Sequence, residues 1–458
     1  KNNTNTQTLS GTNSYTGATT LSGGVLSLIG IGTLGSSAVI NVASGASLLL
    51  SSGSTNRLSD TAEVTVDGTL TLGDSEAIGA LAGASTGSVT IANGEILTIG
   101  VANTLNTTFS GILGGAGGLT KNNTSTQTLS GTNNTYSGVT TINGGTLRVT
   151  QNNALGTTAG ITSIGSSGIL DLQNINYATA ETITLNGGSL IVSSGDSVFS
   201  GPVNVTADSS FGGAGNLTVN GAVNASTVTL DINAGSASSL ILGNVNNDFN
   251  LVTITQANNV SLFDINSIDL GAVNIVDRLT ISTGAAGAIN GTSLLNVPVL
   301  DLTASSGIGL SNTNATSLLF NNSSNMVNVV SSATNFQVAG NGGSGNVRIT
   351  STGNIALNSV STSGTIELIA GGAITDNNDA AINLTGSTAT LQSATGVGST
   401  NAIETALSGL VFTNTTGAVQ IENSSTASLN LQGTTTGAIT IAHNTVGGNL
   451  NIVGNLDS

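Results

Sequence analysis

Pairs of apolar residues separated by one polar residue recur along the whole chain. Alternation with a period of two places both members of such a pair on one face of a β-strand. No stretch shows a sustained helical period, in which apolar residues recur three and four positions apart. The pattern therefore predicts an all-β chain built from many short strands. Clear examples near the end of the chain are Val419 and Ile421, Leu429 and Leu431, Ile439 and Ile441, and Leu450 and Ile452.

The spacing of these pairs predicts how the strands are arranged. Near the end of the chain the first members of the pairs recur roughly every ten positions. Earlier pairs follow one another at about twice that interval, and they begin at Leu279, Leu300 and Leu318 and at Val347 and Ile366. Such intervals are typical of a coil with about two or three strands in each turn. Residues separated by the doubled interval would then lie above one another, and the chain would make about 20 turns.

An antiparallel sandwich also has a strand every ~8–12 residues, but other features favour the coil. Aromatic residues, common anchors of sandwich cores, make up only 2% of the chain. Pro202 and Pro298 lie where strands would begin, a position that tolerates a missing N–H. We therefore predict a parallel β-helix that forms one continuous solenoid over residues 1–458. Its predicted corners include the Asn-Gly dipeptides at 143–144, 186–187, 220–221 and 290–291.

One long phrase occurs twice in the sequence. KNNTNTQTLSGTN begins at Lys1 and KNNTSTQTLSGTN begins at Lys121, and the copies differ only where Asn5 is replaced by Ser125. A tyrosine and a Gly-Gly pair follow each copy at matching distances, with one extra residue before the second tyrosine. Repetition of this kind indicates stacked units and not one closed core. Residues 1–150 thus contain two marked copies, residues 151–458 contain looser turns, and the glycine-rich segment 111–118 is the clearest candidate for a corner or boundary.

Composition excludes several classes of protein. Only 6% of residues are charged, whereas Gly is abundant at 63 residues and Pro is rare at 2. The net charge is −16, and six basic residues cannot form the phosphate-neutralising face that nucleic-acid binding requires. The absence of Cys excludes disulfides and thiolate metal sites. No apolar run approaches the ~18 residues of a membrane span, so we expect no transmembrane segment. Because basic residues are so few, we also expect no nucleic-acid partner.

Paired carboxylates are the first candidates for chemistry, because glycan-cleaving enzymes place two acids around the bond that breaks. Asp264 and Asp269 lie close together in the sequence, and so do Asp74 and Glu76. With 22 acids scattered along the chain, such pairs also arise by chance. Basic and aromatic partners for a sugar are missing nearby. We therefore expect no catalytic residue and no enzymatic activity.

Two segments could hold a metal ion. His443, the only histidine, follows a predicted strand and has no acid within three residues, so a position in a surface ladder is expected. The segment Asp376–Asp379 could offer oxygen ligands to Ca²⁺, but a turn is the favoured interpretation. Calcium-binding β-rolls need an Asp where GGAGGL (114–119) and GGAGNL (212–217) have Leu. We expect no bound metal and no cofactor.

The remaining candidates are weaker. Asp277 and Arg278 could form half of a lyase site, but no second base supports them. Thr182 to Thr184 form a Thr-x-Thr triplet of the kind found on ice-binding faces, yet Thr is also a favoured outward residue of strands. Lys1 and Lys121, the only lysines, share a repeat position, and a corner contact is the expected reason.

The segment 109–149 resembles the passenger repeat of bacterial autotransporters. The first copy joins the same pattern at Lys1, and residues 56–100 resemble the turns between repeats. From about residue 340 onward, GNIAL (353–357) and GGAITD (371–376) are similar to filamentous haemagglutinin-type exoproteins. The elements of the repeat pattern are Gly115 to Lys121, Leu129 to Gly131, Asn134 to Gly138, Thr140 to Ile142, and Gly145 to Leu147.

The resemblance implies a right-handed parallel β-helix that is exported to the bacterial surface for adhesion or as a stalk. No signal peptide opens the chain, and the first residue falls inside a repeat, so we expect a part of a longer protein. Our first hypothesis is therefore an extracellular, non-enzymatic structural or adhesive protein at the bacterial cell surface. Its expected partners are surface glycans or proteins of a host or neighbouring cell, and further copies of itself stacked end to end through open strand edges. The alternatives are a β-helix that binds or cleaves polysaccharides and an ice-binding protein.

Overall fold

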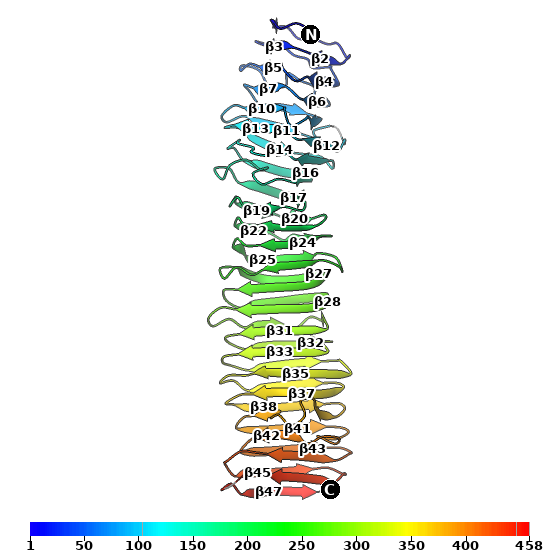
Figure 1. Ribbon diagram of the computed structural model, residues 1–458, viewed down its shortest axis with the longest axis vertical. Coiled ribbons are helices and arrows are strands. Elements are labelled where there is room, and N and C mark those ends of the chain that lie inside the picture. Colours follow the sequence, from blue (N-terminus) through cyan, green and yellow to red (C-terminus); the bar gives the residue numbers. More distant parts are fainter. Residues whose placement is uncertain (103, 446, 458) are drawn as a thin grey trace. The chain divides into compact units, whose positions relative to one another are not determined.

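The computed structural model describes residues 1–102, 104–445 and 447–457, and within them it contains β-strands and turns but no helix (Figure 1). The chain divides into two compact units, Lys1–Leu240 and Ile241–Ser458. Strands in each unit pair in parallel and stack as a β-solenoid, with about 21 turns in all. The predicted fold class is therefore confirmed. That the turns form one continuous solenoid stays a prediction.

Unit 1 contains short strands that mostly span three to five residues. They are β1 (Thr6–Leu9), β2 (Thr19–Leu21), β3 (Gly24–Leu28), β4 (Val39–Val42), β5 (Ala46–Leu50), β6 (Glu63–Val66), β7 (Thr69–Leu72), β8 (Glu76–Ile78), β9 (Ala80–Ala82), β10 (Ser88–Ile91), β11 (Ile96–Ile99), β12 (Thr107–Phe109), β13 (Ile112–Gly115), β14 (Gly118–Lys121), β15 (Thr126–Leu129), β16 (Thr140–Val149), β17 (Thr162–Leu172), β18 (Asn176–Tyr177), β19 (Ile183–Asn186), β20 (Ser189–Val192), β21 (Asp196–Phe199), β22 (Val203–Ala207), β23 (Ser209–Gly213), β24 (Asn216–Val219) and β25 (Val223–Asn233).

Unit 2 begins with two long strands that bend around corners, and shorter strands follow them. They are β27 (Asp248–Asp264), β28 (Ile268–Thr283), β29 (Ile289–Gly291), β30 (Leu295–Asn296), β31 (Val299–Ala304), β32 (Ile308–Thr313), β33 (Ser317–Asn322), β34 (Val327–Ser331), β35 (Asn335–Asn341), β36 (Val347–Ser351), β37 (Asn354–Ser361), β38 (Thr365–Ala370), β39 (Ile374–Asp376), β40 (Leu384–Thr385), β41 (Thr388–Ser393), β42 (Ile403–Ala406), β43 (Gly409–Asn414), β44 (Val419–Asn423), β45 (Leu429–Thr434), β46 (Ile439–His443) and β47 (Leu450–Asp457). The remaining strand, β26 (Ser239–Leu242), includes the residues at which the units are divided.

The strand pairs predicted from the sequence lie above one another in parallel register. Leu279 in β28 pairs with Leu300 in β31, which pairs in turn with Leu318 in β33. Val347 in β36 pairs with Ile366 in β38. The pairs at the end of the chain behave in the same way, since β44 pairs with β46 and β45 pairs with β47. The doubled interval in the sequence is therefore the length of one turn.

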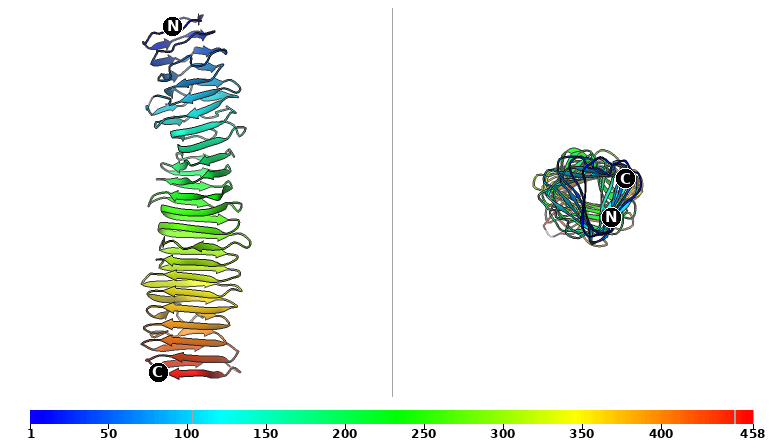
Figure 2. Two further views of the ribbon diagram at one scale, coloured as in Figure 1. Left: turned by 180° about the vertical axis from the view of Figure 1, so that it is seen from behind. Right: turned by 90° about the horizontal axis from the view of Figure 1, so that it is seen from above.

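Apolar side chains fill the inside of each unit. Seen from above, the backbone winds around a central region (Figure 2). The inward residues of the strands lie there, mostly Val, Ile and Leu, and nearly all of them are inaccessible to water. Neighbouring residues alternate between this interior and the surface, as in β6, where Val64 and Val66 are buried and Thr65 is half-buried. Burial of these inward rows, at about 25 cal/mol per Å², is the main stabilising contribution.

Two of the large inward rings are accommodated by a glycine on the next turn. Phe320 in β33 pairs with Gly340 in β35, and Phe412 in β43 pairs with Gly433 in β45. A Cβ atom on Gly340 would lie 2.4 Å from the ring of Phe320, and one on Gly433 would lie 2.4 Å from the ring of Phe412. Each ring therefore occupies space that a side chain on the following turn would otherwise fill.

One prediction about corners is wrong. Asn290 and Gly291 do not form a corner but lie inside strand β29. Asn290 points outward and Gly291 is buried between Leu270 and Leu310, whose side-chain atoms would be 3.4 and 3.2 Å from a Cβ on that glycine. The dipeptide resembled a turn because Asn and Gly favour turns, yet here packing across turns requires the glycine. Both prolines do precede strands, β22 and β31, as predicted.

Candidate functional site

Asp264 and Asp269 do not form a catalytic pair. Asp264 at the end of β27 is buried, and its two carboxylate oxygens accept the backbone N–H groups of Phe249 and Asn266, each at 2.8 Å. Burial raises its pKa to about 6, against the opposing effect of these hydrogen bonds. Asp269 in β28 is exposed and accepts a hydrogen bond from Asn290 at 3.0 Å. One carboxylate faces the interior and the other faces water, so they cannot act on one substrate.

Asp74 and Glu76 serve the backbone of a neighbouring turn. Asp74 Oδ2 accepts the N–H of Ser54 at 2.8 Å. Glu76 in β8 is buried and accepts the N–H groups of Arg57 and Leu58 at 2.9 and 3.1 Å. Burial raises the pKa of Glu76 to about 7, although both hydrogen bonds oppose the shift. The two acids therefore close a corner of the solenoid and do not face a substrate.

His443 forms part of a ladder of polar side chains at the end of β46. Asn423 on the preceding turn donates through Nδ2 to Nδ1 of His443 at 3.1 Å. This bond places the ring proton on Nε2, which lies 3.3 Å from Oγ1 of Thr445. Across the described parts of the chain, no group of three or more His, Asp and Glu residues is placed to hold a metal ion.

The segment Asp376–Asp379 forms a turn that side chains hold in place. The Oδ1 atom of Asp376 accepts hydrogen bonds from the N–H of Asn378 at 2.8 Å and from the amide of Asn383 at 2.7 Å, and its Oδ2 atom accepts one from the amide of Asn401. Asp379 adopts a left-handed backbone conformation, with φ at 58°. Both carboxylate oxygens of Asp376 are therefore used as acceptors within the protein, which agrees with the turn interpretation.

The repeated lysine binds backbone carbonyls of two turns. Lys121 in β14 is buried, and its Nζ atom donates to the carbonyl oxygens of Asn122 at 2.5 Å, of Asn123 at 3.3 Å and of Gly144, one turn later, at 3.3 Å. Burial lowers the pKa of this ammonium group to about 8. Lys1 makes the equivalent contacts with Asn3 at 2.8 Å and with Gly23 at 3.2 Å. The lysine and the Gly-Gly pair of the repeat therefore form one corner.

The second glycine of each Gly-Gly pair is required by this corner. Gly24 and Gly145 both adopt left-handed backbone conformations, with φ at 66° and 64°. A Cβ atom on Gly145 would lie 2.3 Å from the carbonyl oxygen of Asn123, and one on Gly24 would lie 2.4 Å from that of Asn3. Only glycine allows the backbone of one turn to approach the previous turn so closely.

The repeat tyrosine and a buried glutamate form a polar cluster that the sequence did not indicate. Tyr136 is buried, and its hydroxyl lies 2.7 Å from that of Thr140. Glu181 is also buried and accepts hydrogen bonds from the hydroxyls of Thr162 and of Tyr177, the latter at 3.3 Å. Burial raises the pKa of Glu181 to about 7, although both hydrogen bonds oppose the shift. Tyr177 lies four residues before Glu181, with the same spacing as Tyr136 and Thr140, whereas Thr162 belongs to the previous turn and is not visible as a partner in the sequence.

Every basic side chain is engaged by other groups of the protein. Arg57 and Lys121 are buried, and Lys1 is held by backbone carbonyls. Arg278 pairs with an acid one turn later and not with Asp277, so the proposed half-site does not form. Among the described residues, ion pairs join Arg148 with Asp171 at 2.7 Å, Arg278 with Asp301 at 3.1 Å, and Arg348 with Glu367 at 3.1 Å.

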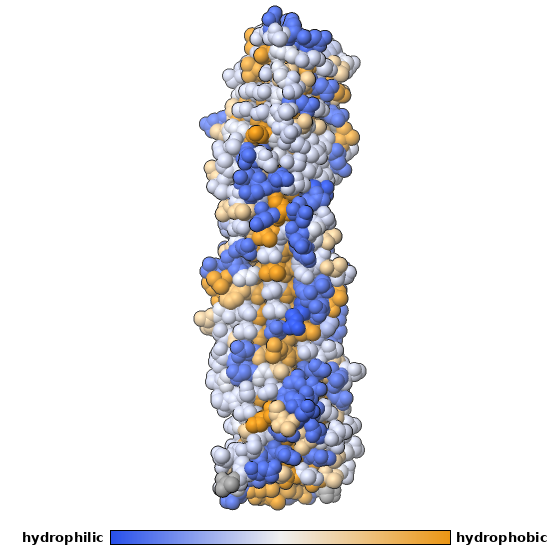
Figure 3. Space-filling model, viewed as in Figure 1, coloured by the Kyte–Doolittle hydropathy of each residue, from blue (hydrophilic) through white to orange (hydrophobic). Residues whose placement is uncertain are grey.

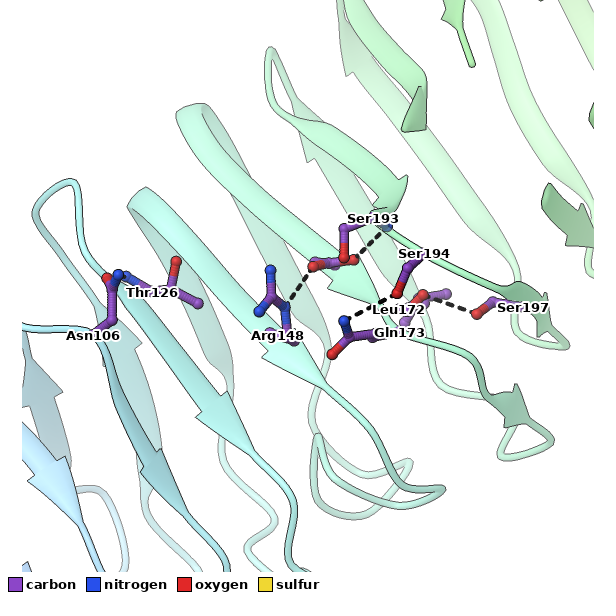
Figure 4. A network of polar contacts seen from close by, with 9 residues as sticks. Asn106, Thr126, Arg148, Leu172, Gln173, Ser193, Ser194 and Ser197 are labelled. Atoms are coloured by element: carbon purple, nitrogen blue, oxygen red, sulfur yellow. Dashed lines mark hydrogen bonds and ion pairs between the residues drawn. The ribbon is translucent and has the colours of Figure 1, made fainter. Parts of the chain in front are cut away.

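One of these ion pairs extends into a network across turns. The buried carboxylate of Asp171 accepts from Arg148 and, through its other oxygen, from the N–H of Ser193 at 2.9 Å. Nearby, the amide of Gln173 donates to Ser194 at 3.1 Å, and Figure 4 shows these side chains following one another from strand to strand. The polar groups thus bind each turn to the next and form no cationic patch.

The outer surface is mainly polar. Figure 3 shows one face, on which pale and blue residues surround short streaks of hydrophobic ones. The Thr-x-Thr triplet predicted as a possible ice-binding element does not extend into an array, since Thr184 lies between Ser163 and Asn204 in register. No helix among the described residues is long and apolar enough to cross a membrane.

Comparisons with known proteins agree with the resemblance found in the sequence. The family model of the passenger-associated-transport-repeat matches residues 1–28 and 119–149, the two copies whose corners are described above. The chain is also 33% identical to the adhesin BmaC autotransporter of Brucella suis over 199 residues, which is 43% of this chain and 5% of that protein. The similarity to an autotransporter passenger is therefore confirmed, although the matched region spans a small part of this much longer relative. No solved structure matches the chain.

Proposed function

We propose that this stretch of autotransporter passenger acts outside the cell as a non-enzymatic solenoid that presents an adhesive surface. The presence of two passenger repeats on a parallel β-solenoid carries the proposal. The adhesin BmaC autotransporter, to which the chain is similar, supports the adhesive part. The carboxylates considered for catalysis bind backbone N–H groups or point away from one another, which supports a role without chemistry.

The backbone arrangement supports a mechanical role as a stalk. Most strands are hydrogen-bonded to a strand of the turn before and to a strand of the turn after, so that bending requires many bonds to distort together. Corner side chains such as Lys121 and Asn134 add bonds between turns. Asn134 accepts the N–H of Leu113 at 2.8 Å and donates to the carbonyl of Ala154 at 2.7 Å, and it thereby joins three turns.

Adhesion is tested with the purified chain coupled to fluorescent beads. Beads that carry the chain are expected to remain on cultured host cells or on neighbouring bacteria in larger numbers than beads coated with an inert protein of similar negative charge. The charge-matched coating is needed because repulsion alone changes bead retention. If beads that carry the chain and beads that carry the inert protein are retained in equal numbers on every cell type, the adhesive function is contradicted.

We propose further that copies of the chain stack end to end through their open strand edges. In β47, Leu450 and Ile452 continue the inward row of Leu429 and Leu431. A further strand could extend this row in the same register, because a strand edge is a template for pairing. The proposed partner is β1 (Thr6–Leu9) of a second copy.

Electron microscopy of the concentrated chain tests this stacking. Filaments are expected for the unaltered chain, and Ile452→Lys is expected to abolish them because it places a charge in the new core. Ile96→Lys, which changes an exposed residue away from β47, serves as the matched control. Discrete particles of one chain at every concentration would overturn the proposal.

A further inference from the structure

A hollow of about 340 Å³ opens on the surface of unit 2, where β27, β28 and β29 follow one another. Leu251, Asp269 and Asn290 line it from one outward row, because they are register partners on consecutive turns. Gly271 and Thr292 belong to the neighbouring outward row and also line the hollow. The site is therefore assembled by stacking and is not visible as a motif in the sequence.

One edge of the hollow lacks a covering side chain. At Gly271 the room is already taken, because the methyl group of Thr253 lies 2.6 Å from the position of an added Cβ. On the next turn, Gly309 is the register partner of Asn290. The nearest atom to a Cβ added at Gly309 would be the side-chain oxygen of Asn290, at 3.7 Å. No side chain of the next turn therefore covers Asn290 from that position.

The polar groups of the hollow are already oriented. The Nδ2 atom of Asn290 donates to Oδ1 of Asp269 at 3.0 Å, so each side chain limits the rotation of the other. This bond does not use Oδ2 of Asp269 or Oδ1 of Asn290, and both atoms are strong acceptors for hydroxyl groups. The hydroxyls of Thr292 and Ser293 add groups that both donate and accept. Less rotational freedom in these side chains lowers the entropic cost of binding.

These groups match the chemistry of one sugar ring. Adjacent hydroxyls of a saccharide can donate to the acceptors of Asp269 and Asn290, while a C–H face can contact the apolar side chain of Leu251. The lining contains one carboxylate and no base, so a sulfate, phosphate or carboxylate on the ligand would meet only negative charge. Elsewhere on the described surface, three arginines are ion-paired, Arg57 and Lys121 are buried, and Lys1 binds backbone carbonyls, so no cluster of free bases offers a site for anionic ligands.

We propose that the hollow at Asp269 and Asn290 binds an uncharged sugar residue, and that the adhesive surface thereby recognises neutral glycans. This inference rests on the proposed adhesive function and specifies its ligand. Binding at one shallow site is expected to be weak, with a Kd of roughly millimolar order. Useful attachment would then depend on many chains or many sugar units binding together.

The experiment is a binding screen of the whole chain against immobilised uncharged mono- and disaccharides and their sulfated or sialylated counterparts. The strongest uncharged ligand is then titrated in solution by NMR against the unaltered chain and two variants. Asp269→Asn keeps the shape of the side chain and removes its charge. Asp277→Asn is the matched control, because Asp277 is exposed on the same strand but does not line the hollow.

We expect an uncharged sugar to bind, its affinity to fall at least about tenfold in Asp269→Asn, and Asp277→Asn to bind like the unaltered chain. Binding should also be insensitive to added salt, since no ion pair forms. A preference for sulfated or sialylated ligands, or equal affinity in all three chains, would overturn the inference. Retention of coated beads on cells together with no binding of any sugar would also overturn it, while leaving the adhesive function intact.

Discussion

At many positions the residue type is restricted by side chains of the neighbouring turn as much as by the adjacent residues in the sequence. Phe320 and Phe412 each lie against a glycine of the following turn. These glycines do not have the positive φ angle that usually explains glycine, so their role is steric. In the sequence alone, Gly340 is visible only as a break in a strand pattern, because Phe320, whose ring restricts this position, lies one turn earlier in the chain.

Replacing Gly340 with alanine is therefore expected to destabilise the chain. The new Cβ would lie 2.4 Å from Phe320, and overpacking of this kind costs about 1–3 kcal/mol. Gly309→Ala is the matched control, because the added Cβ there has open space, and its effect should stay within about 0.5 kcal/mol. Urea unfolding followed by circular dichroism measures both changes. Equal stability of the two variants would show that the ring moves without cost.

Individual candidate residues were harder to predict than the fold. His443 lies in a polar ladder and Asp376 at a turn, as predicted. Proximity in sequence says little about Asp264 and Asp269, because residues of opposite parity in a strand or around a corner can face opposite sides. The sequence did not indicate Glu181. Tyr177 lies four residues before it, but the hydroxyl of Thr162 comes from the previous turn, and the adjacent residues do not reveal that Glu181 is buried.

At the scale of elements, the passenger repeat is a corner that joins consecutive turns. The second copy lies between other turns, and its lysine, glutamine and tyrosine are buried, whereas the first copy has the same residues largely exposed. The same local contacts nevertheless form in both, such as the bond of 2.7 Å from Tyr15 to Thr19 and from Tyr136 to Thr140. The conformation of the repeat is thus local, and the turns on either side determine how strongly it contributes to stability.

We expect Lys121→Met to destabilise the chain more than Lys1→Met does. Methionine fills a similar volume but leaves the carbonyls of Asn122 and Gly144 without their donor, at a cost of about 1–3 kcal/mol. The carbonyls that Lys1 binds are more accessible to water, which replaces the lost bonds. Thermal unfolding of the two variants measures the difference. A larger loss in Lys1→Met would contradict the dependence on burial.

Element positions could be predicted from sequence to a large extent, because apolar residues one turn apart have to lie above one another in the solenoid. The pairs at Leu279, Leu300 and Leu318 show this directly. The long strands β27 and β28 were not foreseen, since each bends around corners that contain no glycine or proline signal strong enough to be read as a break. The hollow at Asp269 was also invisible, because stacking alone brings its residues together.

At the scale of the whole molecule, the placement of basic residues predicts resistance to trypsin. The six possible cleavage sites are buried, held by carbonyls or ion-paired within paired strands. Cleavage requires local opening of the backbone, so the folded chain is expected to stay intact over hours while the urea-unfolded chain is cut. Gel electrophoresis of timed digests measures this. Rapid cutting after Arg278 or Arg348 in the folded chain would show that their strands open readily.

The buried acids predict that the molecule loses stability as the pH rises towards neutrality. Burial raises the pKa of Glu76 and Glu181 to about 7 and that of Asp264 to about 6. Between the unfolded pKa, near 4, and these values the folded chain holds protons that the unfolded chain has released, so stability falls as pH rises. Each group contributes on the order of a few kcal/mol, fully present below pH ~4 and lost above pH ~7.

Glu181 allows this pH dependence to be tested on one side chain. Glu181→Gln keeps one acceptor oxygen, replaces the other with an amide NH2 group and cannot ionise, so its midpoint of thermal unfolding should fall less between pH 5 and pH 8 than that of the unaltered chain. Glu63→Gln, at a half-buried position in β6, is the matched control and should retain the full fall. Calorimetry at several pH values gives the midpoints. A slope that is unchanged in Glu181→Gln would mean that water reaches the carboxylate and that its burial does not control the stability of unit 1.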